Sequence, residues 1–191
     1  MWCANHGVGM KFSDEQRLIV YMLCGIQRAL KVENELNPDF VEKVTATGEE
    51  WAIGEKYPWL LRSEELSEPD YVSETRSILQ TFRTIRQSIN NLDPADAARV
   101  ASGAAASILE FDGFDGNNES EHLAAAGLIT RDAGRWPELA DLVVNSHSST
   151  LDRYRVLVEG VAAFQARNPG GLLSSEQLLE LAELVRRSRQ Q

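Results

Sequence analysis

The sequence predicts an all-α protein, and three observations support this class. Apolar residues recur at steps of three and four over most of the chain, no alternating apolar–polar run stands out as a strand, and Pro, Asn and Gly punctuate the periodic segments. Of the 191 residues, 43% are hydrophobic and 25% are charged, as in an ordinary globular protein. We therefore expect a single helical domain of about seven or eight helices, which could divide into a small N-terminal and a larger C-terminal subdomain.

The start of the chain shows a capping pattern that follows a short extension. Met10 is followed by Ser13 and Gln16, which have the spacing of a helix N-cap and its capping-box partner. We therefore expect residues 1–9 to be a front extension and residues 10–190 to form the helical domain.

The first half of the chain then predicts two helices and a strap. Apolar residues at helical spacing predict a helix over 14–31 with one apolar face. A second helix, 39–47, is expected between Asn37-Pro38 and Gly48. Residues 49–69 carry several aromatic and aliphatic side chains around a proline. We expect a strap that packs across the core, in part a short helix and in part an extended connector.

Residues 70–91 have the strongest periodicity in the sequence. Tyr71, Ile78, Ile85 and Leu92 repeat every seven residues, and a second apolar series follows the same period. This pattern fits either the core helix of a bundle or a seam between two copies of the chain, and both interpretations stay open.

Five further helices are expected in the second half, with polar residues at several of their starts. Asn118 with Glu121 has capping-box spacing, the end of the polar linker at 145–150 can cap the helix that follows, and Ser175 can cap the last helix. These predicted helices are 94–109, 118–130, 136–144, 151–166 and a last one that begins near Ser175.

Charge and cysteine content limit the possible partners and the cellular location of the protein. The net charge of −10 argues against a nucleic-acid partner, because phosphate backbones are usually met by clustered Lys and Arg. Two cysteines cannot form a disulfide framework, the apolar run at 18–26 is too short to cross a bilayer, and the first residues do not resemble a secretory signal. We expect a soluble cytoplasmic protein without a membrane partner.

Several segments, taken in order, resemble one protein family. These segments are Phe12–Ile19, Phe111–Glu119, Gly134–Trp136, Asn145–His147 and Leu151–Arg155. Together they are similar to the YfbU-like family over about residues 10–187. The resemblance implies a small, helical bacterial protein and assigns no activity. Two features depart from the family pattern: Ser148 to Thr150 replace an expected proline, and the front extension looks foreign to it.

The resemblance also directs attention to a set of residues that could contact a ligand or a partner. These residues are Asp112, Phe114, Asp115, Glu119, Arg135, Trp136, Asn145, Ser146, His147 and Tyr154. If the segments around Phe111–Glu119 and Asn145–His147 line one cleft, a ligand site gains support. If they only brace each other, their role is structural.

Known chemistries fit these residues poorly. The oxygen-rich loop at 111–119 lacks the spacing of an EF-hand, and a capping loop explains it more simply. A hydrolase set could be drawn from Ser146 or Ser148 with His147 and Asp115, but residues adjacent in sequence rarely present the required mutual geometry.

Metal and phosphate motifs are also missing. Cys3 and His6 lie in the front extension, Cys24 lies on an apolar helix face, and the sequence has no C-x-x-C pair. Gly170-Gly171 has no Walker lysine. We expect neither a metal nor another cofactor, and the identity of any small-molecule ligand is open.

Three functions remain as hypotheses. The first, which we favour, is a non-enzymatic interaction or regulatory protein that forms homo-oligomers through the helix at 70–91. The second is a DNA-binding regulator, in which helices 39–47 and 70–91 mimic a helix-turn-helix and Arg76, Arg83 and Arg86 meet phosphates, although acidic residues crowd the start of the second helix. The third is a hydrolase that uses His147.

Overall fold

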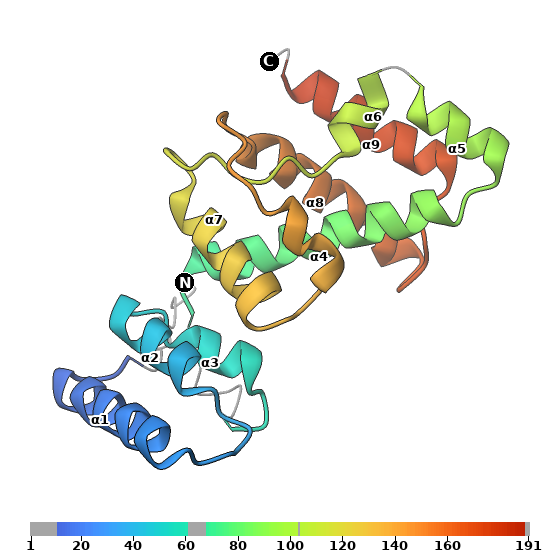
Figure 1. Cartoon of the computed structure of the whole chain (residues 1–191). Helices are drawn as coiled ribbons and strands as arrows, with labels where there is room; N and C mark the ends of the chain where they lie inside the picture. Colours follow the sequence, from blue (N-terminus) through green and yellow to red (C-terminus); the bar gives the residue numbers. More distant parts are fainter. Residues whose placement is uncertain (1–10, 61–67, 103, 190–191) are drawn as a thin grey trace, which may run out of the picture. The chain divides into compact units, whose positions relative to one another are not determined.

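The computed structural model describes residues 11–60, 68–102 and 104–189, and its regular elements are helices (Figure 1). Within these ranges the only β-type pairing is an isolated bridge between Phe114 and Asn145. The predicted all-α class is confirmed. None of the helices in these ranges has the length and hydrophobicity that a membrane span requires. The expected front extension, residues 1–9, lies outside the described residues.

The chain forms two compact units, which are described separately. The first unit contains the residues up to Asp70 together with Leu128–Pro137, and the second contains Tyr71–Gly127 and Glu138–Gln191. The chain therefore leaves the first unit after Asp70, returns to it for one short segment, and ends in the second.

The first unit begins with the predicted capping box. The Ser13 hydroxyl accepts a hydrogen bond from the Gln16 backbone N–H at 3.3 Å, and the Gln16 side chain accepts one from the Ser13 N–H at 2.9 Å. Helix α1, Asp14–Leu30, follows, as the periodicity predicted. Helix α2, Pro38–Thr47, is capped by the Asn37 side chain and ends at Gly48, whose φ of 77° is the left-handed conformation that glycine favours.

A small core holds the first unit together. Phe40 and Val44 of α2 are buried with Trp51 and Ile53 of α3, which spans Trp51–Lys56. The π-helix η2, Leu128–Asp132, is tied to this core because the Asp132 carboxylate accepts a hydrogen bond from Lys43 Nζ at 2.9 Å.

The predicted strap at 49–69 is therefore partly helical. Its first part is α3, after which the Tyr57 hydroxyl accepts a hydrogen bond from the Asn37 N–H at 2.8 Å and joins the residues after α3 to the start of α2. Residues 61–67 of the strap lie outside the described residues.

The second unit is built on helix α4, Asp70–Asn90, which matches the helix predicted over 70–91. Its heptad residues Ile78, Phe82 and Ile85 are fully buried, and Thr75 is buried beside them. Because the apolar series of α4 packs within its own unit, it is not available as a seam between copies, and of the two open interpretations the core helix is correct.

Three later helices differ from their predicted bounds. The helix expected over 94–109 is divided into α5, Pro94–Ala101, and α6, Ala104–Leu109. At Ser102 the backbone is extended, and the serine hydroxyl donates to the Arg99 carbonyl at 2.7 Å, a local hydrogen bond that competes with the helix. Helix α7, Ser120–Gly127, passes into the π-helix η2, and the helix expected over 136–144 is the 3₁₀ helix η3, Pro137–Leu142.

The last two helices pack against each other. Helix α8 spans Leu151–Arg167 and α9 spans Ser175–Ser188, close to their predicted positions. The N-cap of α9 is Ser174, which forms a capping box with Gln177, so the cap lies one residue before the predicted Ser175.

Candidate functional site

The two segments that suggested a site lie side by side in the second unit. The Phe114 N–H donates to the Val144 carbonyl at 3.1 Å, and the Ser146 N–H donates to the Phe114 carbonyl at 3.0 Å. The Asn145 side-chain oxygen accepts a hydrogen bond from the Gly116 N–H at 2.9 Å. The loop at 111–119 and the segment at 143–150 therefore brace each other through their backbones.

Glu119 is the centre of this arrangement and is only 4% exposed. Its Oε1 accepts hydrogen bonds from the N–H groups of Thr150 at 2.7 Å and Leu151 at 2.9 Å. Its Oε2 accepts from the Asp115 N–H at 2.9 Å and from the Thr150 hydroxyl at 2.8 Å. One buried carboxylate thus closes the 111–119 loop and caps the start of α8.

This cap corrects the prediction that the polar linker would cap α8. Thr150 is the residue before the helix, and its side chain forms no cap hydrogen bond. The carboxylate of Glu119 replaces it, because a negative charge at a helix start is stabilised by the free N–H groups and the helix dipole. We refer to Glu119 with its four donors as the Glu119 clamp.

Tyr154 fixes the other end of the loop. Its hydroxyl accepts a hydrogen bond from the Asp112 N–H at 2.9 Å and donates to the Gly113 carbonyl at 2.9 Å. The ring is fully buried and packs with Phe82 and Phe114 at centroid distances of 4.7 and 5.7 Å. Tyr154 and Phe114 are therefore core residues of the second unit.

Two of the three acidic residues of the 111–119 loop, Asp115 and Glu119, have lowered pKa values. Hydrogen bonds from the Asn117 backbone and the Asn118 side chain lower the pKa of Asp115, and the nearby His147 lowers it further. Burial raises the pKa of Glu119, but hydrogen bonds from Asp115, Leu151 and Thr150 outweigh burial and leave the pKa below its ordinary value.

A third carboxylate, Glu74 of α4, forms a charged cluster that the sequence did not reveal. His122 Nε2 lies 2.8 Å from one carboxylate oxygen, and Arg155 Nε donates to the other at 2.7 Å. The hydrogen bond from Arg155 is the main reason that the pKa of Glu74 is lowered. These residues come from three helices far apart in sequence, so no local motif could have linked them.

The geometry does not assemble the proposed hydrolase. His147 is exposed with a φ of 54°, and its N–H donates to the Asn145 side chain at 2.9 Å. The Ser146 hydroxyl donates to the Ser148 carbonyl at 2.7 Å, while the Asp115 carboxylate accepts from the Asn117 N–H at 3.0 Å and from the Asn118 side chain. Among the described residues, no hydrogen bond joins a serine, His147 and Asp115 into a catalytic chain.

The arginines of the DNA-binding hypothesis have protein partners. Arg83 Nε donates to the Glu138 carboxylate at 2.8 Å, and Arg86 donates to the Glu138 carbonyl at 2.9 Å. Their guanidinium groups are therefore used within the second unit, which gives no support to a phosphate-binding surface on α4.

Arg135 and Trp136, which completed the predicted set, belong to the first unit. Arg135 donates to the Glu55 carboxylate at 2.7 Å, and its guanidinium carbon lies 4.5 Å from the centre of the Trp136 ring. Both residues thus have partners within the first unit.

A hollow of about 400 Å³ lies in the second unit between α4, α5 and α6. The predicted site contributes one residue to it, Asp112, which lies beside Phe111 and Leu109. In the described ranges no group of three or more His, Cys, Asp or Glu side chains is arranged to hold a metal ion.

The lowered pKa values predict a loss of stability in acid. A carboxyl group whose pKa is lower in the folded state stabilises the fold. This contribution is complete at a pH above the ordinary pKa, which is 4.5 for Glu74 and Glu119, and it is lost as the pH falls through the lowered pKa. We expect the melting temperature to be nearly constant from pH 7 to about pH 5 and to fall steeply below about pH 4.5. Calorimetry across this range tests the prediction, and a melting temperature that is unchanged down to pH 3 would contradict it.

Comparison with known protein families gives one match. The YfbU domain family matches residues 10–183, which is most of the 191 residues. Among curated proteins and among solved structures, none matches the chain.

Proposed function

We propose that this chain, which belongs to the YfbU family, acts as a self-associating interaction module through the outward side of helix α1. The observation that carries the proposal is a continuous apolar surface on this helix. We define the α1 outer face as the six residues Leu18, Ile19, Met22, Leu23, Ile26 and Leu30. Each of them is between 50 and 69% exposed.

The outer face lies on one side of the helix. At 100° per residue, its six positions fall within an arc of about 140°. Cys24, which is the buried residue of α1, points in nearly the opposite direction, and α1 packs on α2. The helix therefore uses its narrower side for its own unit, and the described part of that unit leaves the broad apolar side exposed.

An exposed apolar surface of this extent marks an interaction site. Over its 17 residues the helix is about 25 Å long, enough to pair with one other helix along its whole length. Polar residues at both ends of the helix bound the surface, as at other protein interfaces.

Charge favours a second copy of the chain as the occupant. Asp14 and Glu15 lie at the start of α1, and Lys31 lies at its end. Arg28, in the last turn, is already paired with Asp39 and Glu42. Two α1 helices that pair in antiparallel orientation place each acidic end beside a basic end, whereas parallel pairing brings like charges together. A membrane surface fits less well, because the chain has a net charge of −10 and anionic lipids attract basic segments.

The mass of the protein in solution tests self-association. By light scattering on the full chain, we expect a mass of 21.3 kDa at about 1 μM that approaches twice this value at about 300 μM. The double variant Met22→Glu/Ile26→Glu, which places charges at the centre of the outer face, should remain monomeric throughout. Both side chains are exposed, so the helical circular dichroism should be preserved.

A matched control uses an exposed apolar residue elsewhere. Leu172 is 45% exposed and lies in the second unit, and Leu172→Glu should associate like the unchanged chain. A wild-type mass that stays at the monomer value up to about 300 μM would refute the proposal, and so would association that the double variant leaves intact.

Cross-linking tests the antiparallel orientation. In a background with Cys3→Ser and Cys24→Ala, an equal mixture of Glu15→Cys and Leu30→Cys chains should form a disulfide-linked heterodimer under mild oxidation. Each variant alone should cross-link poorly, because its two copies of the cysteine lie about 20 Å apart in the antiparallel pair. Efficient cross-linking of Glu15→Cys alone would show parallel pairing instead.

The exposed residues of the segment 145–147 complete the proposal. Asn145 and His147 are exposed, while Phe114, whose backbone pairs with this segment, is buried. We propose that Asn145 and His147 contact a further protein partner, which would give the protein a regulatory role. Neither DNA binding nor hydrolysis is proposed, because no contact of the described residues favours either one.

A further inference from the structure

The hollow between α4, α5 and α6 in the second unit is lined by both apolar and charged side chains. Its volume is about 400 Å³, within the range of sites that bind small molecules. We call it the α4–α6 hollow, and its lining includes Arg86 and Ile89 of α4, Ala106 of α6, Glu110, Asp112 and Leu142. Ile89, Ala106 and Leu142 are half-buried, so part of each apolar side chain is accessible to a ligand.

Arg86 brings a positive charge to the hollow in a fixed position. One nitrogen of its guanidinium group donates to the Glu138 carbonyl at 2.9 Å, which holds the side chain in place. The Glu138 carboxylate is hydrogen-bonded to Arg83 instead. Arg86 is exposed, and within the described ranges its guanidinium group donates to no carboxylate. Its remaining N–H groups can therefore bind an acidic group of a ligand.

The two carboxylates of the hollow differ in their partners. Asp112 accepts a hydrogen bond from Arg153 Nη2 at 2.6 Å, so its charge is compensated. Glu110 is exposed, and it forms no hydrogen bond or ion pair in the part of the chain that the structure describes. Because Arg86 and Glu110 line the same hollow without pairing, one charge of each sign is left for a ligand.

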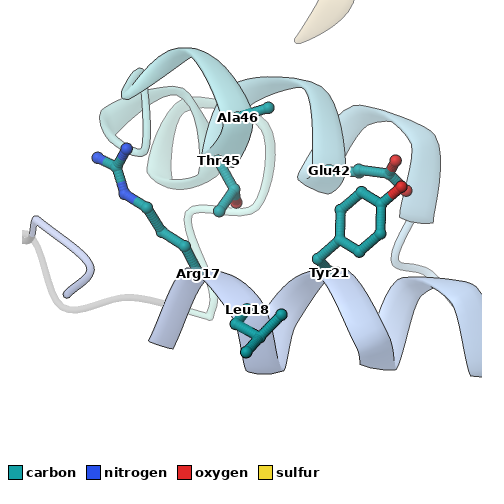
Figure 2. Close-up of a pocket in the computed structure, with 6 residues that line it drawn as sticks. All are labelled: Arg17, Leu18, Tyr21, Glu42, Thr45 and Ala46. Carbon is teal, nitrogen blue, oxygen red and sulfur yellow. The ribbon is translucent and has the colours of Figure 1, made fainter. Parts of the chain in front are cut away.

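A smaller hollow in the first unit, between α1 and α2, shows the opposite case (Figure 2). Its volume is about 250 Å³, and Arg17 and Tyr21 extend into it from α1 while Glu42 lies on α2. Both of its described charged residues already have partners, since Arg17 pairs with Glu50 and Glu42 pairs with Arg28. The charges of this smaller hollow are therefore compensated, whereas those of Arg86 and Glu110 in the α4–α6 hollow are not.

We propose that the α4–α6 hollow binds a zwitterionic amino acid with an aliphatic side chain. The ligand carboxylate accepts hydrogen bonds from Arg86, the ligand ammonium group donates to Glu110, and the ligand side chain packs against the accessible apolar wall. A ligand with a single charge pairs with one of the two residues and is repelled by the other. The site goes beyond the proposed function, because it uses no residue of the α1 outer face.

Three probes with the same aliphatic body test the ligand class. The ¹⁵N-labelled full chain is titrated at pH 7 with L-leucine, with 4-methylpentanoate, which lacks the amino group, and with 3-methylbutylamine, which lacks the carboxylate. We expect leucine to shift the amide signals of Ala106, Glu110 and Phe111 in a saturable way, with a dissociation constant of about 1 mM. The other two probes should bind at least about tenfold more weakly, because each loses one charge-assisted pair.

Two variants test the separate parts of Arg86 and Glu110. Glu110→Gln should lower the affinity for leucine about tenfold and weaken 3-methylbutylamine, without weakening 4-methylpentanoate. Arg86→Gln should lower the affinity for leucine by a similar factor and weaken 4-methylpentanoate, without weakening 3-methylbutylamine. Glu159→Gln is the matched control, because Glu159 is exposed in the same unit and does not line the hollow. Its affinity for leucine should be unchanged.

Three outcomes would overturn the proposal. One is the absence of saturable shifts up to about 50 mM leucine, a concentration at which so small a ligand should saturate its site. The others are binding of either single-charge probe as tightly as leucine, and equal leucine affinity in Glu110→Gln and the unchanged chain. Arg86 also holds the Glu138 carbonyl, so if Arg86→Gln does not fold, Glu110→Gln decides alone. The Glu110 side chain holds no other described residue, and its replacement should leave the fold intact.

Discussion

Replacing Glu119 with glutamine is expected to lower the free energy of unfolding of the second unit by about 2–4 kcal/mol. The carboxylate accepts four hydrogen bonds, and the amide nitrogen of glutamine cannot accept any. The substitution therefore leaves buried donors of the 111–119 loop and of the α8 start without an acceptor. Urea unfolding followed by circular dichroism measures the change.

An exposed glutamate two residues away provides the control. Glu121 lies in the first turn of α7 and is exposed, so Glu121→Gln should change the free energy of unfolding by less than about 0.5 kcal/mol. Glu119→Gln should also flatten the acid dependence of the melting temperature, because one of the carboxyl groups with a lowered pKa is gone. Equal stability of the two variants would show that the Glu119 clamp does not hold the unit together.

Replacing Gly113 with alanine is expected to cost about 4 kcal/mol or more. Gly113 has a φ of 84°, which strains any residue with a Cβ, and a Cβ at this position would lie 2.0 Å from the Val144 carbonyl oxygen. The methyl group would separate the loop from the segment that braces it. A lowered melting temperature, or expression only as insoluble protein, is the expected result.

A substitution at Gly170 distinguishes the strain of a positive φ from the clash with a neighbouring residue. Gly170 lies in the same unit with a φ of 72°, and a Cβ added there has no neighbour within 4 Å. Gly170→Ala should therefore lose only the strain of the backbone, about 1–2 kcal/mol. If the two variants lose the same free energy, the close approach of Gly113 to Val144 has no energetic consequence.

Local patterns in the sequence predicted most of the helices, because helix caps and apolar periodicity depend on residues that are close in sequence. The capping box at Ser13 and the periodicity of α1 and α4 depend on residues three or four apart, which the sequence displays directly. The break at Ser102 was missed because a single serine with its own backbone hydrogen bond is a weak signal within an otherwise helical stretch.

The interactions between distant residues were not predictable in the same way. The cap of α8 comes from Glu119, which is 31 residues from Thr150, and capping rules consider only neighbours. Periodicity showed that α1 and α4 each have an apolar side, but it could not show what covers that side. In the structure the apolar side of α4 is buried and that of α1 is exposed.

The two segments that the sequence singled out lie together in the structure, and their residues play different parts. Glu119 and Tyr154 are buried and hold the loop, whereas His147 is exposed. Sequence similarity singles out both kinds of residue alike, since a motif does not record burial.

The return of residues 128–137 to the first unit has a consequence for the order of events during synthesis. Lys43 and Lys56 donate to Asp132, and Glu55 accepts from Arg135, so part of the first unit consists of partners that emerge much later from the ribosome. At about 5–20 residues per second, the N-terminal helices wait several seconds for these partners. Throughout that delay the apolar residues of α1 are already synthesised, as they are in a nascent chain on a neighbouring ribosome of the same messenger. The proposed pairing through α1 could therefore begin before either chain is complete.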